Sequence, residues 1–444
     1  MIIEQFEDKG LAHYSYTIMS EGQIAIVDPA RDPQPYYEYA NLHDSRIVAV
    51  IETHPHADFV SSHYEISTTK EAPIYTSKLT KATYPHKTFD DGDSFKLGDI
   101  TLHALNTPGH SSDSISVLAK DETSKAYALF SGDTLFVGDV GRPDLREDKE
   151  KPETSRESLA RALYHTTRNK LMDLPDEVIL YPTHGAGSLC GKAISSNPSS
   201  TLGVEKQTNP ALKEMSEEEF VQYLLAEQPF IPAYFVYDVA LNRKGAPDFK
   251  ASVRSVPLLP PDYTLEKGAL VIDTRPAPDF KENHVPGAIN LPNETKFETW
   301  LGTLVRPNEL FYLVAADEAT QKEVICKAAK IGYETSIAGA LVNPNCATEA
   351  SAVTNLNDFR QYPERFTIVD VRNPDEVKAQ KPFPQSLAIP LPELRDRYQE
   401  IPTNKPIMVH CASGYRSAAG SSLLARKIRN LPVYDLGETI QEYI

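Results

Sequence analysis

The sequence has few cysteines, no long apolar run and fewer basic than acidic residues. Four cysteines are scattered over 444 residues, which excludes the dense disulfide framework of small secreted proteins. No stretch of about 18 apolar residues is present, so we expect no membrane-spanning helix. The first residues also lack the basic and apolar segments of a signal peptide. We therefore expect a cytoplasmic protein.

The charge balance narrows the class of partner. The chain carries 62 acidic and 45 basic residues, a formal net charge of −17. A surface of this sign disfavours nucleic acid and anionic membranes as partners. Small anionic substrates would then need local cations, and Arg142 and Arg416 are candidates for that role.

The segment from Cys411 to Ser417, CASGYRS, is the most informative motif near the C-terminus. A hydrophobic run at 406–409 ends at His410, the cysteine follows at once, and small residues after Arg416 predict a helix. The thiol is therefore expected at a strand tip, beneath converging backbone N–H groups and facing a helix N-terminus. That arrangement stabilises a thiolate or a cysteine persulfide. Cys411 and Arg416 are the candidate catalytic residues.

The second half of the chain is an internal repeat. The sequence VIDTR at 271–275 matches IVDVR at 368–372, and INLP at 289–292 matches IPLP at 389–392. Strands that alternate with helices at this spacing predict two α/β units with parallel sheets. The first copy has Ala-Ala-Asp at 315–317 and no cysteine at the loop position. We expect this copy to be catalytically silent, and to pack domains together or to shape a substrate channel.

The first 205 residues place histidines and aspartates directly after short β-rich runs, in turns rich in glycine and proline. These residues are His54, His56, Asp58, His110, Asp133 and His184. Imidazoles and carboxylates fixed at strand ends can hold a metal with open coordination positions. The strand pattern predicts a two-sheet sandwich flanked by helices, and residues 231–240 are expected to form an extended tail of this domain.

The motif His54-Pro55-His56-Ala57-Asp58 resembles the metallo-β-lactamase superfamily, in its glyoxalase II and persulfide dioxygenase branch. Glyoxalase II-like hydrolases carry HxHxDH, whereas this chain has Phe59 at the last position, and phenylalanine cannot bind a second metal. The resemblance therefore implies one Fe(II) per chain, with Zn as the alternative. The implied metal ligands are His54, His110 and Asp133. The implied second-sphere residues are His56, Asp58 and His184.

Three further residues are singled out by the same resemblance. The segment 135–144 is similar to the GRxD segment of persulfide dioxygenases, so Arg142 is expected to hold a substrate carboxylate or the persulfide. The alternative for Arg142 is a salt bridge with Asp144 or Asp139. Tyr181 is expected to line the pocket or to pack. Cys190 matches a cysteine of dioxygenases fused to rhodanese domains. Beside Lys192 it is expected to be a partly ionised catalytic thiol, the alternative being a small buried residue.

The loop around Cys411 closely resembles that of rhodanese sulfurtransferases. Taken together, the resemblances imply an α/β multidomain protein, a metallo-β-lactamase αββα sandwich followed by two rhodanese-like domains with parallel sheets. The expected ranges are 1–248 for the dioxygenase domain, 249–352 for the inactive rhodanese and 353–444 for the active rhodanese. Related enzymes are usually homo-oligomers, so a homo-oligomer is expected here as well.

The implied function is oxidation of small thiol persulfides with O₂ to sulfite, followed by sulfur transfer through Cys411 to give thiosulfate. Two alternatives stay open at this point. One is a zinc-dependent thioester hydrolase of the glyoxalase II kind fused to a sulfurtransferase. The other is a non-enzymatic sulfane-sulfur carrier, which would consume no O₂.

Overall fold

The computed structural model describes residues 1–147, 152–353 and 355–444. Within it the chain divides into two compact units. The first comprises Met1–Ser252 with Ala329–Gly332, and the second comprises Val253–Ala328 with Tyr333–Ile444. Among the described helices, none is long and apolar enough to cross a lipid bilayer.

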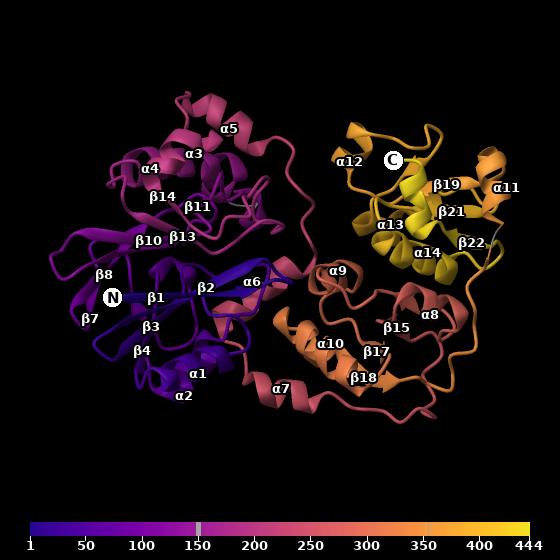
Figure 1. The fold of residues 1–444 in the computed structure, drawn as a ribbon, viewed down its shortest axis with the longest axis horizontal. Coiled ribbons are helices and arrows are strands. Elements are labelled where there is room, and N and C mark those ends of the chain that lie inside the picture. The colour runs from indigo at the N-terminus through magenta and orange to yellow at the C-terminus, as the bar shows by residue number, and fades with distance from the viewer. Residues whose placement is uncertain (148–151, 354) are drawn as a thin grey trace. The chain divides into compact units, whose positions relative to one another are not determined.

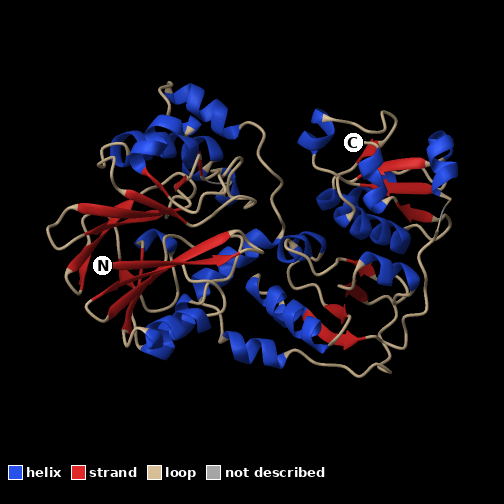
Figure 2. Ribbon diagram, in the orientation of Figure 1, coloured by secondary structure: helices blue, strands red, loops and turns tan. Residues whose placement is uncertain are grey.

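The first unit is built on two six-stranded sheets (Figures 1 and 2). The strands of one sheet, in both chain and spatial order, are β1 (Ile2–Asp8), β2 (His13–Ser20), β3 (Gln23–Val27), β4 (Arg46–Ile51), β5 (Ile74–Thr76) and β6 (Lys87–Thr88). The strands of the other sheet, in spatial order, are β14 (Ser200–Thr201), β13 (Ile179–Pro182), β10 (Ala126–Gly132), β9 (Ile115–Lys120), β8 (Ile100–Asn106) and β7 (Ser94–Leu97). A small hairpin, β11 (Leu135–Phe136) and β12 (Asp139–Val140), follows β10.

Helices cover the outer faces of both sheets, which gives four layers. The helices of this unit are α1 (Gln34–Leu42), α2 (His63–Lys70), α3 (Arg156–Thr166), α4 (Leu202–Thr208), α5 (Glu217–Leu225) and α6 (Tyr234–Lys244). Helix α7 (Phe249–Ser255) contains the boundary between the units. One apolar cluster, which includes Tyr16 and Phe130, joins the two sheets, because alternate residues of each strand point inward. Two further clusters bury the helices, one against each sheet. The predicted αββα sandwich is confirmed.

The expectation of an extended tail at 231–240 is wrong, because helix α6 occupies Tyr234–Lys244. Its run of aromatic and β-branched residues favours a strand locally. However, Tyr234, Phe235, Asp238, Val239 and Asn242 are buried along it, and this spacing is that of one helix face. Tertiary burial therefore overrides the local preference.

The second unit contains two four-stranded parallel sheets with the same strand order (Figure 1). The first sheet, in spatial order, is β16 (Ile289–Asn290), β15 (Leu270–Asp273), β17 (Phe311–Ala315) and β18 (Ile337–Val342). The second is β20 (Leu387–Ala388), β19 (Thr367–Asp370), β21 (Ile407–His410) and β22 (Val433–Asp435). Their helices are α8 (Ala277–Glu282), α9 (Phe297–Leu304), α10 (Glu318–Lys330), α11 (Leu356–Gln361), α12 (Pro374–Ala379), α13 (Leu391–Arg397) and α14 (Tyr415–Lys427). The two α/β domains predicted from the repeat are confirmed.

The repeat extends to individual buried ion pairs. Arg275 Nη2 lies 2.6 Å from Asp273 Oδ2, and Arg372 Nη2 lies 2.7 Å from Asp370 Oδ2. In each copy the same guanidinium also donates a hydrogen bond to a backbone carbonyl, that of Asn283 or Gln380. Because a buried charge is stable only when it is paired, the motif Asp-x-Arg fixes the end of the first strand in both copies.

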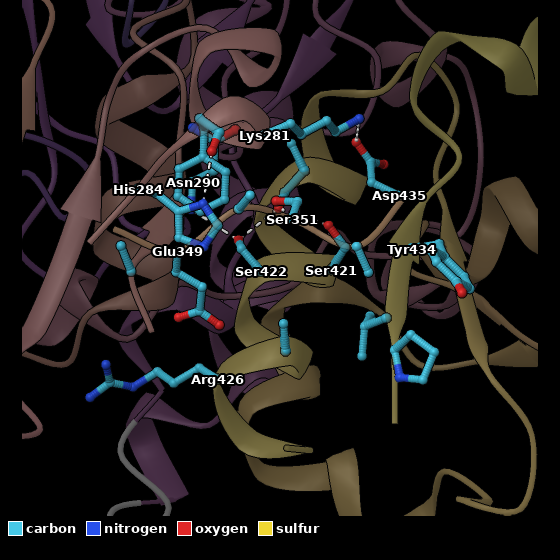
Figure 3. Close-up of a pocket in the computed structure, with 18 of the residues that line it drawn as sticks. Lys281, His284, Asn290, Glu349, Ser351, Ser421, Ser422, Arg426, Tyr434 and Asp435 are labelled. Carbon is cyan, nitrogen blue, oxygen red and sulfur yellow. Dashed lines mark hydrogen bonds and ion pairs between the residues drawn. The ribbon is translucent and has the colours of Figure 1, made fainter. Parts of the chain in front are cut away.

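The two copies pack against each other within this unit. Helix α14 of the second copy lies against the first, where Ser422 Oγ accepts a hydrogen bond from the Asn290 N–H at 2.9 Å. A cavity of about 380 Å³ lies beside this contact, and Figure 3 shows Lys281 and Asp435 pointing toward one another at its rim, 2.7 Å apart. No residue of the loop 411–416 lines this cavity. The first copy thus packs against the second, one of the two roles expected for it.

Candidate functional site: a buried histidine–aspartate centre and a cysteine loop

The loop 53–58 leaves strand β4 and is held from both sides. The Thr53 N–H donates to Asp28 Oδ1 at 2.7 Å. From helix α6, Asn242 Nδ2 donates to the carbonyl oxygens of His56 and Phe59 at 2.9 and 2.8 Å. Neither Asp28 nor Asn242 was identified from the sequence. Asp28 follows strand β3 and carries the same signal as the other strand-end aspartates, whereas nothing local marks Asn242.

Three of the predicted ligands converge at the strand ends. His54 Nε2 lies 3.7 Å and His110 Nε2 3.5 Å from Asp133 Oδ2. The three residues are buried, and one donor atom of each lies within 4.8 Å of the others. His54 Nε2 and both Asp133 oxygens have no hydrogen-bond partner in the described structure. Buried polar atoms without a partner are costly, so this donor set fits a divalent metal ion.

The imidazoles of this centre are oriented by their other ring nitrogens. His110 Nδ1 lies 2.9 Å from the Arg142 carbonyl oxygen and His184 Nδ1 lies 3.1 Å from that of Ala12. A carbonyl oxygen only accepts, so Nδ1 carries the proton in both rings. The lone pair of each Nε2 then points into the centre, as metal-binding histidines require.

The residues predicted for the second sphere lie in the same buried centre. His184 Nε2 lies 3.3 Å from Asp58 Oδ2 and 3.5 Å from Asp133 Oδ1. His56 Nε2 lies 3.2 Å from Asp28 Oδ1. His56 is also within ligand reach of Asp133 and His184. The centre therefore has more potential donors than one ion requires.

Phe59 closes one wall of this centre. Its ring stacks on His56 with centroids 4.4 Å apart and packs against His13 at 3.9 Å. His13 is a buried imidazole that sequence reasoning did not single out. Phe59 thus takes the place of a donor with an apolar, close-packed surface.

The structure does not place Arg142 as a free cation for substrate. Its Nε and Nη2 donate to Asp144 at 2.7 and 2.6 Å, and Nη2 also donates to the Pro229 carbonyl at 2.7 Å. The side chain is 1% exposed. The salt bridge with Asp144, the alternative considered from sequence, is the observed state. Arg142 instead orients His110 through its backbone carbonyl.

Arg146 is a cation near the metal centre that sequence reasoning missed. It pairs with Asp113 at 2.8 Å, donates to the Pro55 carbonyl at 3.1 Å and is 10% exposed. Its charge is among the causes that lower the pKa of His54 and His110, after burial. Arg146 is thus paired with an aspartate, as Arg142 is, but its side chain is more exposed, 10% against 1%.

Tyr181 and Cys190 differ from their predicted functional roles. Tyr181 stacks on Phe130 with centroids 5.3 Å apart and contacts Tyr16, so it packs in the core between the sheets. Cys190 is 1% exposed, and burial raises the pKa of its thiol. The expectation of a partly ionised thiol is wrong, because the Asp58 and Asp133 carboxylates raise the pKa further and Lys192 Nζ donates to the Tyr223 carbonyl instead.

The second candidate site is the turn between strand β21 and helix α14. Cys411 directly follows the strand and is fully buried, and its Sγ accepts a hydrogen bond from the Gly414 N–H at 3.1 Å. Gly414 has a φ of 107°, a conformation that glycine adopts without strain. The turn thus brings backbone N–H groups and the helix N-terminus to the sulfur, as the sequence predicts.

Arg416 faces a carboxylate. Its two Nη atoms donate to Glu376 of helix α12 at 2.5 and 2.6 Å. Burial alone would raise the pKa of Glu376, but these hydrogen bonds outweigh it and lower the pKa. The predicted role of Arg416 in binding anionic sulfur is therefore not what this geometry shows. Arg416 joins the first turn of helix α14 to helix α12, while the Gly414 N–H contacts Cys411 Sγ.

The corresponding turn of the first rhodanese-like copy is shorter. Only Ala316 and Asp317 separate strand β17 from helix α10, whereas four residues, Cys411 to Gly414, separate strand β21 from helix α14. Asp317 Oδ1 accepts the Thr320 N–H at 2.8 Å and caps the helix. No disulfide joins any of the four cysteines, all of which lie in the described part of the chain.

Comparisons with known proteins agree with this architecture. The profile of the metallo-beta-lactamase superfamily matches residues 8–184, and that of the rhodanese-like domain matches 263–338 and 353–441. The chain is 34% identical to a metallo-beta-lactamase from Staphylococcus aureus subsp. aureus COL, with a TM-score of 0.70, over 77% of this chain and 99% of that one. The chain belongs to the metallo-beta-lactamase superfamily. In it, a metallo-beta-lactamase domain is followed by two rhodanese-like domains.

Two curated relatives of this metallo-beta-lactamase domain have different names. The cytoplasmic hydroxyacylglutathione hydrolase of Arabidopsis thaliana is 35% identical over 134 residues, 29% of this chain and 52% of the relative. The mitochondrial persulfide dioxygenase ETHE1 of Homo sapiens is 27% identical over 208 residues, 46% of this chain and 71% of the relative. The chain spans 52%, 61% and 59% of the length of three hydroxyacylglutathione hydrolases. The family includes hydrolases and dioxygenases, and this chain has the buried His/Asp metal-binding groups of that fold.

Proposed function

We propose that the metallo-beta-lactamase domain oxidises small thiol persulfides with O₂ to sulfite, and that Cys411 transfers sulfane sulfur to form thiosulfate. The observation that carries this proposal is the group of two imidazoles and one carboxylate, His54, His110 and Asp133, in a chain that also bears a rhodanese cysteine turn. Two histidines and one carboxylate are the donor set of non-haem iron oxygenases. The rhodanese-type cysteine turn in the same chain supports a sulfur compound as the substrate of the metal centre.

His54, His110 and Asp133 would hold an iron(II) ion, which when bound supplies a site for O₂ activation. The residues around them keep the two imidazole Nε2 atoms and the carboxylate in place. Phe59 and the buried walls exclude water from this centre. Arg146 is the cation that would attract the persulfide anion. The balanced reaction is RSSH + O₂ + H₂O → RSH + SO₃²⁻ + 2 H⁺.

The sulfur transfer is assigned to the turn of the second rhodanese-like domain. The Cys411 thiolate attacks the outer sulfur of a second persulfide, and the thiol RSH leaves after taking up a proton. Sulfite then attacks the outer sulfur of the cysteine persulfide, the S–S bond breaks, and thiosulfate departs. The Gly414 N–H and the N-terminus of α14 stabilise the anionic sulfur at each stage. Joining both domains in one chain raises the local concentration of sulfite.

The alternative is a thioester hydrolase, and one observation favours it. The identity to the Arabidopsis hydrolase is 35%, against 27% to the human dioxygenase, although over a shorter segment. Metal-bound hydroxide would then be the nucleophile. The two functions differ in metal content and in O₂ consumption.

The proposal is tested by anaerobic purification, metal quantitation and O₂-electrode assays with several thiol persulfides. We expect about one iron per chain and persulfide-dependent O₂ uptake. Hydrolysis of a glutathione thioester without O₂ uptake would overturn the proposal in favour of the hydrolase. Loading of sulfur on Cys411 with neither reaction would indicate a sulfur carrier.

Two variants separate the sites. His110→Ala should lower iron content and O₂ uptake at least 100-fold but leave sulfur transfer by Cys411 within about twofold; His103→Ala, on strand β8 outside the centre, is the matched control. Cys411→Ser should abolish thiosulfate formation and leave O₂ uptake unchanged, with Cys346→Ser as its control. Equal loss of both activities in either variant would contradict two separate sites.

A further inference from the structure

The cavity between the two rhodanese-like copies has the size and lining of a small-molecule site. Its volume is about 380 Å³, and pockets that bind small molecules have volumes of about 300–1,000 Å³, apolar walls and a few fixed polar groups. Here the walls come from α8, β16, α14, β22 and the segment 349–353. Apolar or small side chains such as Phe280, Ala418 and Ala425 form much of them. Of the described residues, none that belongs to the metal centre or to the loop 411–416 lines this space.

One wall carries a buried acceptor that no protein group satisfies. The Asn290 side chain is 1% exposed, and its Nδ2 donates to the carbonyl oxygens of Asp273 and Arg275 at 3.1 and 2.9 Å. Because carbonyl oxygens only accept, these two bonds fix the orientation of the amide. Its Oδ1 has no hydrogen-bond partner in the described part of the chain. A buried amide oxygen without a donor is costly, and Asn290 lines the cavity from which a donor could reach it (Figure 3).

The repeat shows that the strand end does not require this amide. Asn290 lies opposite Asp273 in the first sheet, and Ala388 occupies the position opposite Asp370 in the second. The buried ion pair of the motif Asp-x-Arg is present in both copies. The second copy therefore builds the same strand end with a methyl group, and the polar side chain of the first copy has a different reason.

The other polar side chains around the cavity also offer acceptors. His284 Nδ1 donates to the Phe280 carbonyl at 2.8 Å, so in the uncharged ring Nε2 carries a lone pair. On helix α14, the hydroxyls of Ser421 and Ser422 donate to the Ala418 carbonyl at 3.2 and 2.7 Å. Their oxygens can then only accept. A molecule that fits this lining must therefore bring hydrogen-bond donors.

The charged side chains of the lining are paired within the protein. Lys281 Nζ lies 2.7 Å from Asp435 Oδ2, and Arg429 Nη1 lies 2.9 Å from Glu349 Oε1. The guanidinium of Arg426 donates to three backbone carbonyls. An ionic ligand would enter without a counter-charge and would bear the full cost of leaving water. The lining therefore favours an uncharged molecule.

We infer that this cavity binds a small uncharged ligand that donates N–H hydrogen bonds, such as a carboxamide or an amino-substituted heteroaromatic ring. An N–H of the ligand meets Asn290 Oδ1, while its flat apolar body packs on Ala418 and Ala425. Helix α14 begins at the cysteine turn and continues along this cavity. The ligand would thus occupy an effector position, in contact with both rhodanese-like copies but not with the sulfur. Binding is non-covalent and is independent of the proposed oxidation and sulfur transfer.

The test uses the full-length chain and three compounds with the same ring. Benzamide is uncharged and donates N–H, methyl benzoate has no N–H, and benzoate is charged. Binding is followed by saturation-transfer NMR and by the melting temperature. We expect benzamide to bind with a Kd of about 1 mM, ordinary for a compound of this size, and about tenfold or more tightly than the other two. Equal binding of methyl benzoate would overturn the inference. So would the absence of benzamide binding, which would mean that the cavity holds only water.

Variants assign the binding to the cavity. Ala425→Leu fills part of the space and should abolish benzamide binding, whereas Lys427→Leu, on the same helix but outside the lining, should retain it. Asn290→Leu removes the amide at similar size, so it should weaken benzamide about tenfold and leave methyl benzoate unchanged. Benzamide binding that survives Ala425→Leu, or a preference for benzamide that survives Asn290→Leu, would refute the site. Circular dichroism checks the fold of each variant, and the comparison of the three compounds on the wild-type chain decides the question for any variant that does not fold.

Discussion

The substitution Gly141→Ala tests whether close backbone packing fixes the group of His54, His110 and Asp133. A Cβ at Gly141 would overlap the carbonyl oxygen of Asp133 and lie 3.0 Å from the Cβ of His110. Real Cβ atoms do not approach backbone atoms that closely, so the segments that carry two ligands must separate. Ligand geometry tolerates displacements of only about 0.5 Å. The substitution should therefore act on metal binding directly.

The magnitude follows from the kind of atom that is displaced. Overpacking typically costs about 1–3 kcal/mol, and the cost here should lie at the upper end because the clashing atom belongs to the backbone. Expressed as metal affinity, about 1–3 kcal/mol is a loss of roughly 5- to 150-fold. We expect the Gly141→Ala chain to lose metal on dialysis under conditions in which the wild-type chain retains it.

Metal content after dialysis and the melting temperature are the two measurements. The matched control is Gly22→Ala, in the turn between β2 and β3, where an added Cβ meets nothing within 4 Å but the φ of +70° strains the backbone. That variant should melt earlier and keep its metal. A Gly141→Ala chain with wild-type metal content and melting temperature would refute the packing argument.

Two further predictions concern stability. Arg372→Ala leaves Asp370 buried without its partner and should cost about 3–5 kcal/mol in urea unfolding, whereas Arg397→Ala, which breaks a surface pair, should change little; similar losses in both would show that burial is not the cause. Burial raises the pKa of Glu65 to about 7, from an ordinary value of 4.5, so its protonated form favours folding. That contribution is complete below pH 4.5 and is lost as the pH rises to 7, so the wild type should lose stability in urea relative to Glu65→Gln between pH 4.5 and pH 8. The cost of removing the carboxylate from the buried Arg31, 3.5 Å away, is common to both pH values; an unchanged difference between the two pH values would contradict the assignment.

The ends of the strands could be predicted from the sequence, because a short run of β-favouring residues marks each strand. His54 follows strand β4 and Asp133 follows β10, and parallel or neighbouring strand ends meet at one edge of a sandwich. The cysteine turn was equally accessible, since strand, cysteine, glycine and helix are consecutive in the chain. Local sequence patterns thus predicted which residues could lie together at the site.

Contacts between residues that are far apart in the chain could not be predicted from the sequence. Arg142 donates to a carbonyl 87 residues away, and Asn242 supports His56 from 186 residues away. Arg416 and Glu376 are 40 residues apart, and nothing in the sequence of either segment predicts that the two side chains pair. Whether a cation meets substrate or a carboxylate is decided by such contacts. The carboxylate partners of Arg142 and Arg416 could not be predicted for this reason, and the raised pKa of the Cys190 thiol could not because burial depends on the whole fold.

The length of the turn in the first rhodanese-like domain has an evolutionary consequence. With two residues between strand and helix instead of four, a cysteine introduced at Ala316 would stand beside a helix cap formed by Asp317, without a ring of amides to receive sulfur. A single substitution at Ala316 would therefore not reproduce the four-residue turn that holds Cys411; an insertion would be required as well. The buried Asp273–Arg275 pair, by contrast, is kept in this copy, so what holds the end of its first strand does not depend on the cysteine turn.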